Sequence, residues 1–257
     1  MASFASWKPK ILILSLALNL IFGVLFVYIV HKKGGMPYLI KKTKVIISTS
    51  NLSPSGPGKN QRSYSRRYFD RKSIYESLPD EEHEIIFLGD SITDDGEWTE
   101  LFKNLKIKNR GIPGDRTSGV LNRLPEVVSS FPDKIFLMIG YNDLSRRLGI
   151  DEIVTNYETI LQTIRARSPG TKIYIQSVLP VRYDKYKGEV KNHQVIQLNN
   201  RLRQLSQRFD ATYIDLFSQF CDSDEQLRKD FAGTDGLHLN GKAYRKWKSI
   251  LENHIYN

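Results

Sequence analysis

Ser91, Asp235 and His238 are the side chains best suited to nucleophilic catalysis. Ser91 follows a short apolar run and offers a hydroxyl, which becomes a good nucleophile only when a neighbouring base removes its proton. Imidazole suits that task near neutral pH, and Asp235 lies three residues before His238, close enough to hold the ring in one tautomer. Taken alone, Ser91 is also explained as the N-cap of a helix, because Ser and Asp are common where a strand passes into a helix.

Two further segments contain groups that donate hydrogen bonds. Residues 109–115 hold two glycines and a proline, which predict a tight turn with exposed backbone N–H groups. Asn142 comes just after a strongly apolar run, where its amide can donate into a cleft. An ordinary loop and an Asn-Asp turn explain the same residues, so each segment by itself is a weak signal.

Alternating strand and helix patterns begin at about residue 84. These elements must position the four segments discussed above, which contain Ser91, residues 109–115, Asn142 and residues 235–238. Apolar runs predict strands at 84–89 and 134–140, and further strands are predicted at 106–110, 172–178 and 212–216. Helical patterns occur at 98–105, 118–130, 153–164, 195–209 and 241–254. Strands that alternate with helices predict a parallel sheet covered on both faces. Ligands of such sheets bind at the carboxyl ends of the strands, which is where we expect the chemistry.

The four segments, taken in order, resemble the SGNH/GDSL hydrolase family over roughly residues 84–254. The matching blocks are Gly89-Asp90-Ser91, Gly114-Asp115, Gly140-Tyr141-Asn142-Asp143 and Asp235-Gly236-Leu237-His238. The resemblance implies a three-layer α/β/α, flavodoxin-like fold with about five parallel strands. It also implies a serine esterase or acylhydrolase that acts on ester bonds without a metal or other cofactor.

The resemblance also implies a role for individual residues. Ser91 would be the nucleophile, His238 the base, and Asp235 the residue that orients His238. The backbone N–H groups of Ser91 and Gly114, together with the side-chain amide of Asn142, would form the oxyanion hole. Loss of one such donor typically costs ~3 kcal/mol of transition-state stabilisation.

Four other residues are predicted to line the substrate site: Asp90, Arg116, Tyr141 and Pro180. Arg116 stands where the family often has a small or hydroxylated residue, and it faces either an anionic substrate or solvent. Pro180 belongs to a loop that follows a predicted strand. The charged segment 184–193 is interpreted as a solvated loop.

The N-terminal third of the chain differs in composition from the rest. Residues 1–79 carry 13 Lys/Arg and 2 Asp/Glu, whereas residues 80–257 carry 25 and 26. The basic pI of 9.5 therefore belongs to the N-terminal region and does not indicate a nucleic-acid-binding domain. Residues 11–30 contain no charged side chain, and as a helix they would span roughly 30 Å, the thickness of a bilayer core.

We therefore predict a short tail at 1–10, an uncleaved transmembrane anchor at 11–30, a basic Ser/Pro/Gly-rich linker at 31–79, and a hydrolase domain at 80–257. The expected partners are a lipid bilayer at 11–30 and an acyl-ester substrate. Lysines are more numerous after the span than before it, which favours a cytoplasmic domain, whereas the resemblance allows an extracytoplasmic one. Cys221 is the single cysteine, which excludes an intramolecular disulfide.

The predicted function is a membrane-anchored serine esterase that forms an acyl-enzyme on Ser91. The substrates that the resemblance implies are lysophospholipids, small lipid esters, thioesters or O-acetyl groups on glycans. Two alternatives stay open: an O-acyltransferase that uses the same site, and a non-catalytic binding domain on a tether. The sequence does not set the oligomeric state.

Overall fold

The computed structural model of the chain describes Tyr28 and residues 64–256. The predicted anchor at 11–30 lies outside these residues, apart from Tyr28, which is helical and exposed. Among the helices of the described part, none combines the length and the apolar character that a bilayer span requires.

Five parallel strands form the central sheet, as predicted, in the order β2-β1-β3-β4-β5. Their bounds are β1 Ile85–Gly89, β2 Ile107–Gly111, β3 Lys134–Met138, β4 Lys172–Gln176 and β5 Thr212–Ile214. This is the flavodoxin-like order. The chain adds β2 on one side of β1 and then adds β3, β4 and β5 on the other side. Every residue of β1 and β3 is buried, which explains why both were continuous apolar runs in the sequence.

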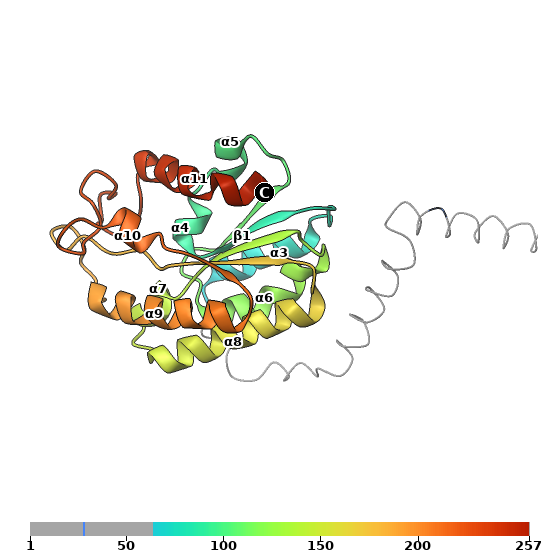
Figure 1. Ribbon diagram of the computed structural model, residues 1–257, viewed down its shortest axis with the longest axis horizontal. Coiled ribbons are helices and arrows are strands. Elements are labelled where there is room, and N and C mark those ends of the chain that lie inside the picture. The colour runs from blue at the N-terminus through green and yellow to red at the C-terminus, as the bar shows by residue number, and fades with distance from the viewer. Residues whose placement is uncertain (1–27, 29–63, 257) are drawn as a thin grey trace, which may run out of the picture. The chain divides into compact units, whose positions relative to one another are not determined.

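Helices cover both faces of the sheet and complete the three layers (Figure 1). One face carries α6 Thr117–Ser129, α8 Ile150–Arg167 and α9 Asn192–Arg208. The other face carries α5 Trp98–Phe102 and α11 Gly241–Tyr256. Three short helices, α4 Ser91–Asp94, α7 Tyr141–Ser145 and α10 Phe217–Phe220, begin just beyond strands β1, β3 and β5.

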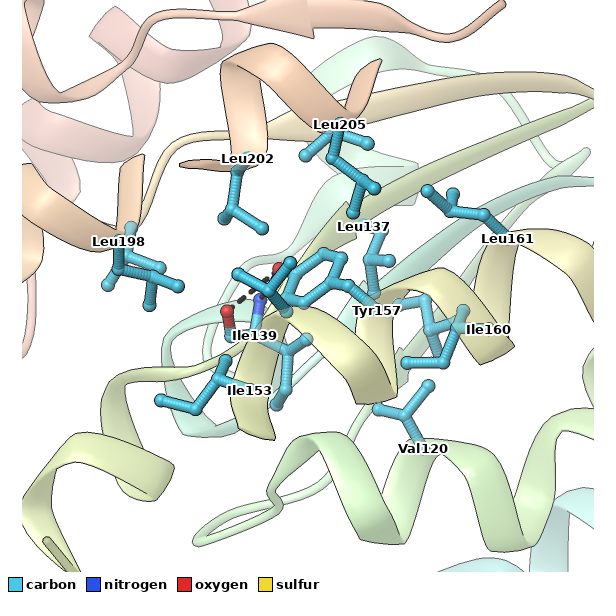
Figure 2. Close-up of a cluster of buried hydrophobic side chains, with 14 of the residues drawn as sticks. Val120, Leu137, Ile139, Ile153, Tyr157, Ile160, Leu161, Leu198, Leu202 and Leu205 are labelled. Atoms are coloured by element: carbon cyan, nitrogen blue, oxygen red, sulfur yellow. Dashed lines mark hydrogen bonds between the residues drawn. The ribbon is translucent and has the colours of Figure 1, made fainter. Parts of the chain in front are cut away.

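Tyr157 of α8 links the core on one face to the edge where catalysis is expected. Its ring is fully buried among the apolar side chains of α8, α9 and β3 (Figure 2). Its hydroxyl donates to the carbonyl oxygen of Ile139 at 2.8 Å and accepts from the Ile139 N–H at 3.2 Å. Ile139 lies just past the end of β3, and the tyrosine hydroxyl bonds both of its backbone polar groups. The tyrosine thereby fixes the backbone that leads into Gly140 and Asn142.

The second core is built from aromatic rings. Phe87 of β1 stacks on Trp98 at a centroid distance of 4.4 Å, and Trp247 of α11 packs edge-on against Trp98 at 4.9 Å. The Trp98 indole N–H also donates to the carbonyl oxygen of Thr93 at 2.8 Å. Thr93 belongs to the same short helix as Ser91, so the aromatic core fixes the element that carries the hydroxyl.

The segment just before residue 80 differs from the prediction. Residues 66–77, interpreted as part of the linker, form helix α3 Arg66–Ser77, and Ser65 caps its N-terminus by accepting the Tyr68 N–H at 3.1 Å. Tyr68 and Tyr75 are buried, and their hydroxyls donate to the carbonyl oxygens of Gly119 and Gly111 at 2.8 and 2.7 Å. Only these two side chains of α3 are buried, so its apolar periodicity was too weak to identify.

Candidate active site

Ser91, His238 and Asp235 form a continuous series of hydrogen bonds at the carboxyl edge of the sheet. Ser91 is the first residue of α4, directly after β1, and its Oγ lies 2.9 Å from His238 Nε2. His238 Nδ1 lies 2.6 Å from Asp235 Oδ2. The other carboxylate oxygen of Asp235 accepts the backbone N–H groups of Leu237 and His238 at 3.0 and 2.9 Å. In this geometry an imidazole can remove a proton from a serine hydroxyl.

The charge state of Asp235 follows from its hydrogen bonds. Burial opposes ionisation, but the bonds from the His238 ring and from two backbone N–H groups outweigh it and lower the pKa of Asp235 to about 2. The carboxylate is therefore anionic at neutral pH. It accepts a hydrogen bond from the Nδ1–H of His238, which leaves Nε2 without a proton and able to accept the proton of Ser91.

Gly114 and Asn142 lie on two segments that the structure joins directly. Gly114 has φ +76°, a left-handed conformation that favours glycine, and a Cβ built there would meet no atom within 4 Å. Asn142 is the second residue of α7, and its Nδ2 donates to the carbonyl oxygen of Asp115 at 3.0 Å. The same nitrogen lies 3.4 Å from Asp90 Oδ2, a longer and weaker contact.

Asp143 fixes the turn of Gly114 against α7. It is completely buried and accepts the backbone N–H of Thr117 at 3.0 Å and the Thr117 hydroxyl at 2.6 Å. Thr117 begins α6, immediately after the turn. Burial raises the pKa of Asp143, while the bonds from Thr117 lower it.

Of the four residues predicted to line the substrate site, three are buried and one is half-buried. Asp90 is 3% exposed and caps α4 by accepting the Ile92 N–H at 3.1 Å. Tyr141 is 5% exposed, and Pro180 is also buried. Arg116 is half-buried, with its guanidinium over the ring of Tyr64 at 5.7 Å. Asp90 and Tyr141 lie at the starts of the short helices that follow β1 and β3.

Tyr186 belongs to the site region, although the segment 184–193 was interpreted as a solvated loop. Its hydroxyl is hydrogen-bonded to that of Tyr141 and accepts the Val190 N–H at 3.3 Å. The Arg182 N–H, two residues before this segment, donates to the carbonyl oxygen of Gly236 at 2.7 Å, and the Arg182 carbonyl oxygen accepts the Tyr186 N–H at 2.8 Å. The segment thus contacts both the helix of Asn142 and the loop of His238. A tyrosine among charged residues was the only signal in the sequence.

Within the described residues, no group of three or more His, Cys, Asp or Glu side chains is arranged to hold a metal ion. The groups that the structure does bring together are a hydroxyl, an imidazole and a carboxylate. They come from segments as far apart as residues 91 and 238, and they can carry out acyl transfer through a serine.

Comparison with known proteins identifies relatives over the same region. Residues 87–246 match the model of the GDSL-like Lipase/Acylhydrolase family. Platelet-activating factor acetylhydrolase IB subunit alpha2 from Rattus norvegicus is 31% identical over 179 residues, which cover 65% of this chain and 73% of that protein.

Solved structures share the fold. A Streptococcus pneumonia protein, named provisionally as a platelet activating factor, is 30% identical with a TM-score of 0.69, over 74% of this chain and 94% of that one. A GDSL-like lipase from Bacteroides thetaiotaomicron has a TM-score of 0.64 over 73% of this chain and 96% of that one. It is only 20% identical, so this second likeness concerns the fold alone.

Proposed function

The chain belongs to the GDSL-like lipase/acylhydrolase family and is a carboxylic ester hydrolase, and on that premise we propose that it removes short acyl groups, in particular acetyl groups, through an acyl-enzyme on Ser91. The observation that carries this proposal is the hydrogen-bonded series Ser91–His238–Asp235. The named relative with 31% identity, an acetylhydrolase, supports the choice of a short acyl group.

The first half of the proposed reaction acylates Ser91. His238 Nε2 takes the hydroxyl proton while Oγ attacks the ester carbonyl carbon, and a tetrahedral intermediate forms. Asp235, ionised at neutral pH, stabilises the imidazolium that results. The intermediate then collapses: the bond to the leaving oxygen breaks, His238 returns the proton to that oxygen, and the alcohol departs.

The second half releases the acyl group as a carboxylic acid. Water attacks the acyl carbonyl carbon as His238 removes its proton, and a second tetrahedral intermediate forms. The bond between the acyl carbon and Ser91 Oγ breaks, and His238 returns the proton to Oγ. The free hydroxyl and the hydrogen bond to Nε2 are thereby restored.

The proposed oxyanion hole consists of the N–H groups of Ser91 and Gly114 and the amide of Asn142. One N–H of that amide is occupied by the Asp115 carbonyl oxygen at 3.0 Å, which orients the side chain. The contact of the same nitrogen to Asp90 is longer and weaker, at 3.4 Å, and we propose that the oxyanion takes the place of this contact. Donors held in place before the reaction stabilise the developing charge without rearranging.

The test compares Ser91→Ala with wild type in the full-length protein on p-nitrophenyl acetate, butyrate and octanoate. We expect wild type to prefer acetate and Ser91→Ala to lose at least roughly a thousandfold in kcat, because the nucleophile is absent. Ser249→Ala is the matched control, since this serine lies exposed on α11 and its hydroxyl donates to the Lys246 carbonyl oxygen at 2.7 Å. Retained activity in Ser91→Ala would refute the mechanism, and a preference for octanoate would refute the choice of acyl group.

We also propose that residues 11–30 anchor the enzyme in a membrane. The support is the run of twenty residues without a charged side chain, followed by a lysine-rich stretch. The protein should then sediment with membranes, resist extraction by carbonate, and dissolve in detergent. Protease treatment of intact cells identifies the side: protection places the catalytic domain in the cytoplasm, as the flanking lysines favour, whereas cleavage places it outside.

A further inference from the structure

We propose that the buried ion pair between Arg123 and Asp115 is a positioning device that holds together the three segments supplying the oxyanion hole. The proposal rests on the proposed function, because it concerns the donors of that hole. Neither residue is expected to touch the substrate. Arg123 was not among the residues predicted to belong to the site.

Arg123 connects two of the three segments. Its side chain, on α6, is completely buried, as is that of Asp115. Its Nε donates to Asp115 Oδ2 at 2.9 Å, and its Nη2 donates to the carbonyl oxygen of Gly89 at 3.1 Å. Gly89 ends β1, two residues before Ser91, and Asp115 directly follows Gly114. One planar guanidinium therefore spans the strand end that carries the nucleophile and the turn that carries a donor.

Asp115 connects the third segment. Its backbone carbonyl oxygen accepts the Asn142 amide at 3.0 Å. Its second carboxylate oxygen, Oδ1, accepts the backbone N–H of Arg116 at 2.8 Å, which closes the turn onto itself. A change in the position of Asp115 would therefore move the Gly114 turn and the Asn142 amide at once.

Two features around the ion pair lower the stability of the folded protein. Gly119 lies inside α6, where glycine disfavours the helix by ~1 kcal/mol relative to alanine. A Cβ at that position would lie 1.8 Å from Asp115 Oδ1, so the glycine makes room for the carboxylate. Arg123 Nη1 is buried without a hydrogen-bond partner among the described residues. Buried ion pairs are often replaceable by apolar residues without loss of stability, so stability alone does not account for this one.

A second buried pair on the same helix provides a matched control. Arg110 Nε donates to Glu126 Oε1 at 2.7 Å, and the two side chains are 7% and 11% exposed. The other bond given by the Arg110 guanidinium goes to the Asn109 carbonyl oxygen. This pair also ties α6 to the sheet, but none of these bonds reaches Gly89, Asp115 or Asn142.

The experiment measures kcat, KM and Tm for Arg123→Met and Arg110→Met in the full-length protein with p-nitrophenyl acetate. We expect Arg123→Met to lower kcat by ~10- to 100-fold with KM changed less than about threefold, because displaced donors weaken transition-state binding. Arg110→Met should lower Tm comparably and leave kcat within about threefold. Equal losses of kcat in both variants would overturn the proposal.

Two further variants keep the test decisive. If Arg123→Met fails to fold, Arg123→Lys replaces it, since a lysine can pair with Asp115 but cannot bridge to Gly89 at the same time, and kcat should again fall.

Asn142→Ala is then added to the Arg123 variant. If Arg123 acts through the oxyanion hole, the combined loss of kcat is smaller than the product of the single losses, whereas a merely structural role gives the full product. Ser91→Ala and Asn142→Ala that retain activity would instead refute the proposed function itself.

Discussion

Two carboxyl groups near Ser91 have opposite environments, and this difference sets their charge at neutral pH. Asp235 is half exposed and receives three hydrogen bonds, which hold its pKa at about 2. Asp90 is buried next to Ser91, and burial raises its pKa to about 7. The first is therefore a permanent anion suited to an imidazolium, whereas the second releases its proton close to physiological pH.

Asp90→Asn should stabilise the protein more at pH 8 than at pH 5. Burial raises the pKa of Asp90 from 3.8 to about 7, against the opposing hydrogen bond from the Ile92 N–H. At intermediate pH the unfolded chain has released this proton and the native protein retains it. The free energy of unfolding therefore falls as pH rises from about 4 to about 7. Asn has no proton to release and keeps an oxygen for Ile92, so it should remove that fall.

Thermal unfolding at pH 5 and pH 8 measures this effect. We expect Asp90→Asn to raise Tm by several degrees at pH 8 and by fewer degrees at pH 5, where only part of the fall has occurred, since 1 kcal/mol shifts Tm by ~2–4 °C in a domain of this size. Asp95→Asn is the control, because Asp95 is exposed and lies at the end of the same helix. A gain in Tm that is equal at the two pH values would show that Asp90 does not titrate in this range.

At the scale of elements, the segment 182–190 and the Asp235–His238 loop hold one another in place. Gly236 has φ +72°, and a Cβ there would lie 2.6 Å from the carbonyl oxygen of Arg182 and 2.8 Å from the Tyr186 nitrogen. Tyr186 in turn bonds to Tyr141, beside Asn142. The segment 182–190 therefore contacts both the loop that carries His238 and the helix that carries Asn142.

Gly236→Ala should therefore impair catalysis as well as stability. The alanine must adopt a left-handed conformation, which costs ~1–2 kcal/mol, and its methyl group must displace the 182–186 backbone. We expect kcat to fall by at least about tenfold, since the Asp235–His238 loop moves with that backbone. The control is Gly149→Ala, because φ is −66° at Gly149 and a Cβ would meet no atom within 4 Å. Unchanged kcat in Gly236→Ala, measured with p-nitrophenyl acetate, would contradict the coupling.

The sequence predicted elements well where local patterns carry the information. The apolar runs at 84–89 and 134–140 became β1 and β3, and the helical pattern at 241–254 became α11. The Ser91–His238 contact was expected only because four blocks occurred together in order. The pairing of Tyr141 with Tyr186 joins helix α7 to a loop 45 residues further along the chain, so no local pattern in the sequence could indicate it.

At the scale of the whole domain, helix α3 joins the parts that carry the proposed nucleophile and oxyanion donors. Tyr75 and Tyr68 bond to Gly111 and Gly119, which flank the turn of Gly114. Arg71 on the same helix contacts Asp94, the last residue of the helix that Ser91 begins, at 3.1 Å. The segment before residue 80 is therefore part of the folded catalytic unit, and a protein cut at residue 80 would lack one wall of it.

Tyr75→Ala in the full-length protein tests whether α3 supports the catalytic unit. The variant removes a side chain that is 4% exposed and a bond to the Gly111 carbonyl oxygen, so it should lower the free energy of unfolding by ~3 kcal/mol. Ile74→Ala on the same helix is the control: this side chain is 48% exposed, and its loss should change stability by less than ~0.5 kcal/mol. Denaturant titration measures both. Equal, small effects would mean that α3 contributes little to the domain, whereas a large loss confined to Tyr75→Ala means that the catalytic unit begins before residue 80.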